Sequence, residues 1–190
     1  MQQKLSKPTR EDVAYHEAGH AVIAYLTGYH IIDGPIHIDG EETEDGHAHT
    51  PIAEDDGRIE ERRLKGWVID EFERRKQRSV IAVAGYTAEL VHAAIEGLDF
   101  NERRAFMGAH GDVETVRQTW GPQSFYPFSK ALGSEMAQPE VWDMVEALAK
   151  ALLENDGPLP SESAMSVLES SRRSSEAPFR LFLPYLRPPN

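Results

Sequence analysis

Three residues near the start of this chain have types and a spacing that can do chemistry: His16, Glu17 and His20, within the segment His-Glu-Ala-Gly-His. On a helix, residues four positions apart point the same way, so both imidazoles can bind one metal ion. Glu17 follows the first histidine, and its carboxylate can reach a water molecule beside that metal. A metal that polarises a carbonyl, next to a carboxylate that takes a proton from water, is the chemistry of peptide or amide hydrolysis.

This chemistry needs a helix, and the surrounding residues predict one. Thr9 can cap a helix, and Asp12 lies three positions later, where a capping box has its acid. The segment 13–26 is rich in Ala, Val, Ile and Leu and has no proline, and Gly28 can end the helix. Inside a helix, Gly19 destabilises the helix by about 1 kcal/mol relative to alanine. A close approach of other backbone or of substrate would explain why a glycine stands there. The alternative is a buried helix with two incidental histidines.

The composition narrows the classes of function. Acidic residues outnumber basic ones by 32 to 20, and the net charge of -12 argues against nucleic acid or an anionic membrane as a partner. The chain has no cysteine, so any zinc must be held by nitrogen and oxygen ligands. It shows no run of 18 apolar residues, no apolar signal core near its start and no GxxxxGK(S/T) phosphate loop. We therefore expect a cytoplasmic protein with no membrane segment and no ATP site.

The length and patterning predict one domain over residues 1–173, followed by a proline-rich tail over residues 174–190. β-Branched residues around Pro35 predict one or two short strands at a sheet edge. The acidic segment 33–57 predicts a solvated loop, and the segment 125–128 predicts an aromatic turn. Apolar periodicity and start signals predict helices over residues 58–77, 79–95, 112–120, 139–156 and 161–171.

The metal also needs a third ligand, because zinc in a hydrolase usually takes three protein ligands and one water molecule. Spacing alone leaves eight candidates open. His47 and His49 in the acidic segment are more typical of a surface pair, and His92 on an apolar helix is more typical of a core histidine. The candidates are His37, His47, His49, Glu89, His92, His110, Asp112 and Glu114.

Several segments resemble the zinc peptidase domain of the FtsH type, in the order in which that family has them. Residues 14–22, Ala-Tyr-His-Glu-Ala-Gly-His-Ala-Val, resemble its zinc-binding motif. Residues 84–89, Ala-Gly-Tyr-Thr-Ala-Glu, resemble its Gly-Gly-Arg-x-Ala-Glu segment, with Tyr86 in place of the arginine. Residues 108–112, Gly-Ala-His-Gly-Asp, resemble its Gly-Ala-x-x-Asp segment. Residues 147–153 and 159–168 resemble the closing helices of that family.

The resemblance implies a mainly α (α+β), zincin-like fold with a small β-sheet or hairpin, and Zn²⁺ as the cofactor. It also implies that Glu17 is the general base and that a strand near residues 36–38 lines the substrate groove. Glu89 is a candidate acceptor for the N–H of a ligand histidine, with a capping or surface acid as the alternative. The metal ligands that the resemblance implies are His16, His20 and Asp112.

The resemblance has limits that shape the functional expectation. The family carries an ATPase module and membrane helices ahead of this domain, and neither occurs in this sequence. We therefore expect an ATP-independent zinc metalloendopeptidase acting on a protein or peptide substrate. Two alternatives stay open: a non-catalytic zincin-fold interaction or regulatory protein, and a regulatory peptidase of narrow specificity. Glu17 favours an enzyme, because a structural metal site needs no base. Self-association into a homo-oligomer also stays open.

Overall fold

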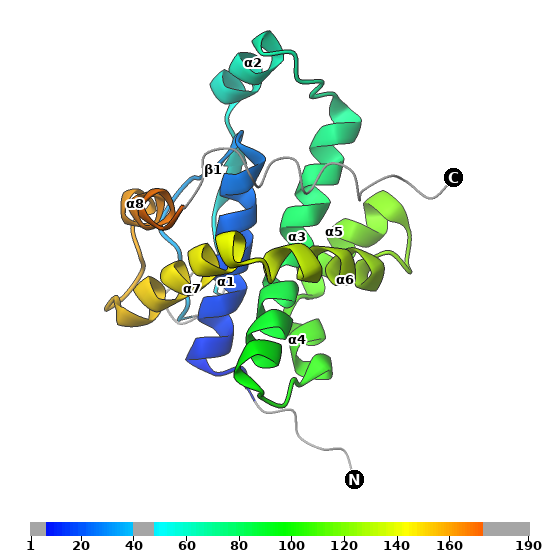
Figure 1. The fold of residues 1–190 in the computed structure, drawn as a ribbon. Helices are drawn as coiled ribbons and strands as arrows, with labels where there is room; N and C mark the ends of the chain where they lie inside the picture. Colours follow the sequence, from blue (N-terminus) through cyan, green and yellow to red (C-terminus); the bar gives the residue numbers. More distant parts are fainter. Residues whose placement is uncertain (1–6, 40–47, 173–190) are drawn as a thin grey trace.

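Helices make up most of the fold (Figure 1). The computed structural model describes residues 7–39 and 48–172, and there the predicted mainly helical fold with a small sheet is confirmed. The predicted tail, residues 174–190, lies outside the described residues. None of the described helices is both long and apolar enough to cross a membrane. In chain order the elements are α1 (Arg10–Thr27), β1 (His30–Ile32), β2 (Ile52–Glu54), α2 (Asp56–Leu64), α3 (Glu71–Glu96), α4 (Glu102–Gly108), α5 (His110–Trp120), α6 (Phe125–Met136), α7 (Pro139–Glu154) and α8 (Ser161–Ser171).

Helix α1 begins and ends as the local sequence predicts. The Thr9 hydroxyl accepts a hydrogen bond from the Asp12 backbone N–H at 3.1 Å, and the Asp12 carboxylate accepts one from the Thr9 N–H at 2.7 Å. These two bonds form the predicted capping box. Gly28 ends the helix with a left-handed φ of 81°, a conformation that glycine adopts at little cost.

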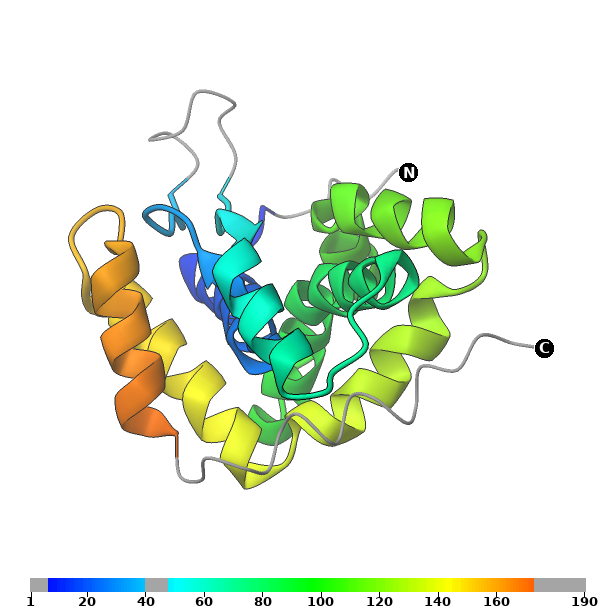
Figure 2. The ribbon, with the colours of Figure 1, turned by 90° about the horizontal axis from the view of Figure 1, so that it is seen from above.

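Helix α1 is buried along most of its length and packs against α3 and α7. A Cβ added at Gly19 would lie 2.5 Å from the Ala84 carbonyl oxygen and 2.7 Å from the Ala88 Cβ, so the glycine lets α3 come close. This close approach of backbone explains a residue that disfavours helix. Figure 2 shows α7 and α8 on one side of α1, with α4, α5 and α6 beyond α3 on the other.

The helix predicted over residues 58–77 is interrupted. Helix α2 ends at Leu64, Gly66 has a φ of 85°, and α3 begins only after Asp70. The Asp70 carboxylate accepts a hydrogen bond from the Glu73 N–H at 2.8 Å and so caps α3. From there α3 continues without a break, joining a charged and an apolar segment that the sequence predicts as two helices.

The region after α3 differs from the prediction at two places. The expected aromatic turn is the first turn of α6, because Pro127 lies where a backbone N–H has no partner within the helix. Phe125 is buried there against Tyr86, with ring centroids 5.3 Å apart. Helix α4 is not among the predicted helices, and Asn101 caps it by accepting a hydrogen bond from the Arg104 N–H at 3.0 Å.

The sheet has one strand, β1, in the segment predicted around Pro35, and its second strand, β2, lies further along the chain. Strands β1 and β2 pair antiparallel, and beyond Pro35 only isolated bridges continue the pairing. This pairing holds the segment 48–54 beside α1, where it contributes to the wall of a cleft. The partners in the sheet are His30 with Glu54, Ile31 with Ala53 and Ile32 with Ile52, and the bridges join Ile36 to Leu159 and His37 to His49.

Candidate metal centre

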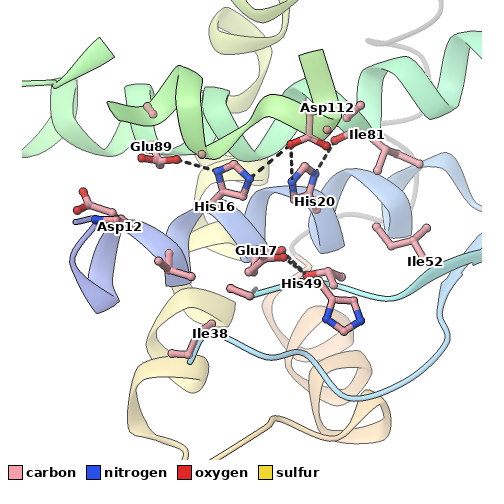
Figure 3. A pocket seen from close by; sticks show the side chains of 18 of the residues that line it. Asp12, His16, Glu17, His20, Ile38, His49, Ile52, Ile81, Glu89 and Asp112 are labelled. Carbon is pink, nitrogen blue, oxygen red and sulfur yellow. Dashed lines mark hydrogen bonds and ion pairs between the residues drawn. The ribbon is translucent and has the colours of Figure 1, made fainter. Parts of the chain in front are cut away.

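The structure brings His16 and His20 of α1 together with Asp112 of α5 (Figure 3). One ligand atom from each residue lies within 4.8 Å of the other two. The Asp112 Oδ2 atom is 3.6 Å from His16 Nε2 and 3.5 Å from His20 Nε2. Ligand atoms about 2.0–2.1 Å from a tetrahedral zinc ion stand about 3.3–3.4 Å apart, so this spacing fits a metal site. The group could hold a divalent ion, and zinc as its identity stays a prediction.

The other ring nitrogens hold the two imidazoles in place. His16 Nδ1 lies 2.7 Å from Glu89 Oε1, and His20 Nδ1 lies 2.8 Å from the Ile81 carbonyl oxygen. Both partners are acceptors, so each Nδ1 donates its hydrogen and each Nε2 can face Asp112. Glu89 is buried in this acceptor position, and the alternative of a surface acid does not hold.

Gly85 of α3 leaves the space that the two rings occupy. A Cβ added at Gly85 would lie 2.5 Å from Nε2 of both His16 and His20. A larger residue would therefore push both rings out of position. Gly85 belongs to the candidate centre although it offers no ligand atom, and no sequence signal assigns it this role.

The charges in this group suit a bound cation. Burial opposes a charge on His16, but hydrogen bonds to Asp112 and Glu89 raise the pKa of His16 well above its ordinary value. Burial also opposes a charge on His20, and Asp112 raises the pKa of His20. Burial disfavours the charged carboxylate of Asp112, yet His20 and His16 hold the pKa of Asp112 well below its usual range. The buried carboxylate between the two imidazoles therefore favours a positive charge at this place, which a bound metal ion would supply.

Arg104 of α4 links the start of α1 to the candidate centre. Its Nη2 atom lies 2.7 Å from Asp12 Oδ1 and 4.0 Å from Glu89 Oε2. Asp12 caps α1 and Glu89 holds His16, so one guanidinium joins two acids that position the ligand helix. Arg104 is not predictable from the sequence, because no spacing along the chain connects residues on α1, α3 and α4.

Glu17, the predicted general base, lies next to the ligand histidines and is 4% exposed (Figure 3). The Thr50 hydroxyl donates a hydrogen bond to Glu17 Oε2 at 2.8 Å. Thr50 lies between the His49 bridge and β2, on a segment that approaches α1 from the side opposite α3. A lone threonine gives no sequence signal for this contact.

The other candidates for the third ligand lie elsewhere. His92 is buried against the Tyr15 ring, with centroids 3.6 Å apart, as expected for a core histidine. His37 and His49 stack across their bridge, with ring centroids 5.4 Å apart. Among the described residues, the only group of three metal-binding side chains is the one that contains Asp112. His110 and Glu114 lie on α5 outside this group, and His47 lies outside the described residues.

The candidate centre opens into a cleft of about 1620 Å³. The segment 48–54 lies on one side of the cleft, and α4 and the start of α5 lie on the other. Ile38 also lines it, but residues 36 and 37 form isolated bridges and not the expected strand, and a substrate-binding role for this segment stays a prediction. The apolar part of the lining includes Val13, Ile38, Ile52, Ile81, Ala105 and Met107.

Comparisons of the chain with protein-family models, with curated proteins and with solved structures found no match. The FtsH-type resemblance therefore rests on the sequence segments quoted above and stays a prediction.

Buried His30, at the edge of the cleft, should make the stability of the fold depend on pH. Burial lowers the pKa of His30 from 6.5 to about 4, although Glu54 opposes this shift. Its Nδ1 is 2.8 Å from the Thr27 hydroxyl, and its Nε2 is buried with no hydrogen-bond partner among the described residues. Below about pH 6.5 the unfolded chain therefore binds a proton at His30 that the folded protein does not accept until about pH 4.

As the pH falls from about 6.5 to about 4, His30 should remove on the order of 3 kcal/mol from the free energy of unfolding. Urea unfolding at these two pH values measures the loss. His30→Gln cannot titrate, so its free energy of unfolding should fall by that much less over the same range. Equal losses in the two proteins would show that His30 takes up its proton normally when folded.

Proposed function

We propose that this chain is a zinc-dependent metalloendopeptidase that hydrolyses peptide bonds without ATP. The observation that carries the proposal is the convergence of His16, His20 and Asp112 beside the buried carboxylate of Glu17 in an open cleft. The proposal includes a zincin-like fold of the FtsH peptidase type and a cytoplasmic location. The sequence motifs support this fold, and the cytoplasmic location stays a prediction.

In this proposal His16, His20 and Asp112 would hold the metal as its three protein ligands. Catalytic zinc sites have this arrangement, whereas structural sites use four protein ligands. A bound zinc ion supplies Lewis acidity, which polarises a carbonyl and makes a water molecule more acidic. Glu17 accepts the proton of the attacking water and returns it to the leaving amine. Its Oε1 is the atom for this transfer, because Thr50 contacts Oε2.

The wall of the cleft favours an extended peptide as substrate. The bridge to His37 uses the backbone N–H and carbonyl of His49. Because backbone groups alternate along an extended chain, those of Ala48 and Thr50 point the other way, and both residues line the cleft. A peptide that pairs with this edge adds a strand, a common mode of peptide recognition.

Cleavage of casein by the zinc-loaded protein in the absence of ATP tests the proposal. We expect cleavage that 1,10-phenanthroline abolishes and that added zinc restores, since the metal is required for both water activation and carbonyl polarisation. Casein and a mixture of random-sequence peptides should be tested together, because a peptidase of narrow specificity cleaves few of them. Stoichiometric zinc without cleavage of any of these substrates would contradict the proposal and favour a non-catalytic zincin-fold protein.

A further inference from the structure

Thr50 is the residue that contacts the carboxylate of the proposed base. Its hydroxyl is 2.8 Å from Glu17 Oε2 and 3.2 Å from the Glu17 backbone oxygen, so its single hydrogen is directed at one residue. Thr50 is half-buried and Glu17 is almost fully buried, so bulk water competes little for this bond. The contact joins α1, which carries two of the proposed metal ligands, to the segment 48–54, which carries none.

We propose that Thr50 is a positioning residue that holds the Glu17 carboxylate in the orientation needed for proton transfer, an inference that rests on the proposed peptidase function. The terminal torsion of a glutamate side chain is broad, so burial alone does not set the plane of its carboxylate. A donor on Oε2 sets that plane and directs Oε1 as the oxygen that exchanges the proton. Each functional side chain of α1 then has its own anchor: Glu89 for His16, Ile81 for His20 and Thr50 for Glu17.

The backbone on both sides of Thr50 is held firmly enough for this role. His49 and His37 exchange two backbone hydrogen bonds, at 3.0 and 3.1 Å, directly before Thr50. Pro51, directly after it, accepts a hydrogen bond from the Asp33 N–H at 2.9 Å and has a fixed φ. The β-branched side chain of Thr50 also has few rotamers. The hydroxyl is therefore already in place before a substrate binds.

Two substitutions separate the hydroxyl from the shape of the side chain. Thr50→Val keeps the branched shape and removes the donor, and Thr50→Ser keeps the donor. With a fluorogenic peptide, we expect kcat of Thr50→Val to fall about 10- to 100-fold, because a misplaced catalytic group costs this much in rate. We expect KM to stay within about twofold, and kcat of Thr50→Ser to stay within about threefold of the wild-type value. The zinc content of all three proteins should be the same.

A second measurement uses the metal-free protein and needs no activity. The ¹³Cδ resonance of Glu17, assigned by its loss in Glu17→Gln, should shift in Thr50→Val and stay in place in Thr50→Ser. An unchanged resonance in Thr50→Val, or a kcat of Thr50→Val equal to that of the wild type, would overturn the inference. If the wild-type protein cleaves nothing, the proposed function fails, and the resonance still decides whether Thr50 orients Glu17.

Discussion

Glu17→Gln should lower kcat for peptide hydrolysis by about 10²- to 10⁴-fold and leave zinc binding intact, because the amide cannot accept a proton from water. The change preserves the size of the side chain, and the amide oxygen of glutamine can still accept the hydrogen bond from Thr50. The three proposed ligands keep their own contacts, since none of them depends on Glu17 for a hydrogen bond. Initial rates on a fluorogenic peptide, together with zinc content by atomic absorption, measure the two effects.

Glu11→Gln is the matched control for this experiment. It makes the same chemical change on α1, at an exposed residue in the first turn that does not line the cleft. Its kcat should stay within about twofold of the wild-type value, because changes at exposed positions have small effects. Full activity of Glu17→Gln with bound zinc would refute the role of Glu17 as base. An equal loss in both variants would point to a general effect of charge on α1.

Gly85→Ala should weaken zinc binding by at least about 100-fold in a protein that stays folded. The added Cβ would lie 2.5 Å from Nε2 of both His16 and His20, so both rings must leave the positions in which they face Asp112. Changes around metal ligands that leave the ligands themselves in place already cost about 10- to 100-fold in affinity. Competition with a chromophoric zinc chelator measures the affinity, and circular dichroism reports whether the helices persist.

Gly133→Ala is the control for the glycine substitution. Gly133 also lies within a helix, but a Cβ there would be 3.7 Å from Thr87 Cγ2 and 3.9 Å from Val91 Cγ2, which are ordinary contact distances. Its zinc affinity should equal that of the wild type. Undiminished zinc affinity in Gly85→Ala would mean that the histidine rings do not bind metal from the positions seen here.

The parts of the site that lie on one helix are predictable because the interactions behind them are local. Thr9 and Asp12 cap α1, and an apolar run without proline continues it to Gly28. The helical period then places two histidines four positions apart on one face. Each of these interactions spans only a few residues, so a pattern in the sequence is enough to show it.

Helix boundaries elsewhere are harder to predict, because the residues that favour a helix and those that end one contribute free energies of similar size. Charged residues favour one helix through the segment 58–77, yet the cap at Asp70 and the left-handed Gly66 divide it. Pro127 suggests a turn, but a proline is tolerated in the first turn of a helix, and burial of Phe125 supports the helix that forms. Differences of about 1 kcal/mol per residue are decided by packing.

The sequence by itself determined the helix that presents His16, Glu17 and His20, and the mainly helical class of the fold. Residue spacing leaves Asp112 as one of eight candidates for the third ligand. Only the resemblance to the FtsH-type peptidase domain favours it over the others. The tertiary structure decided that Asp112 meets the histidines, and that Gly85 and Thr50 lie against the same helix. These contacts exist because burial of apolar faces packs α1 and α5 against α3 and holds the segment 48–54 beside α1. No local pattern carries that information, because the residues concerned are far apart in the sequence.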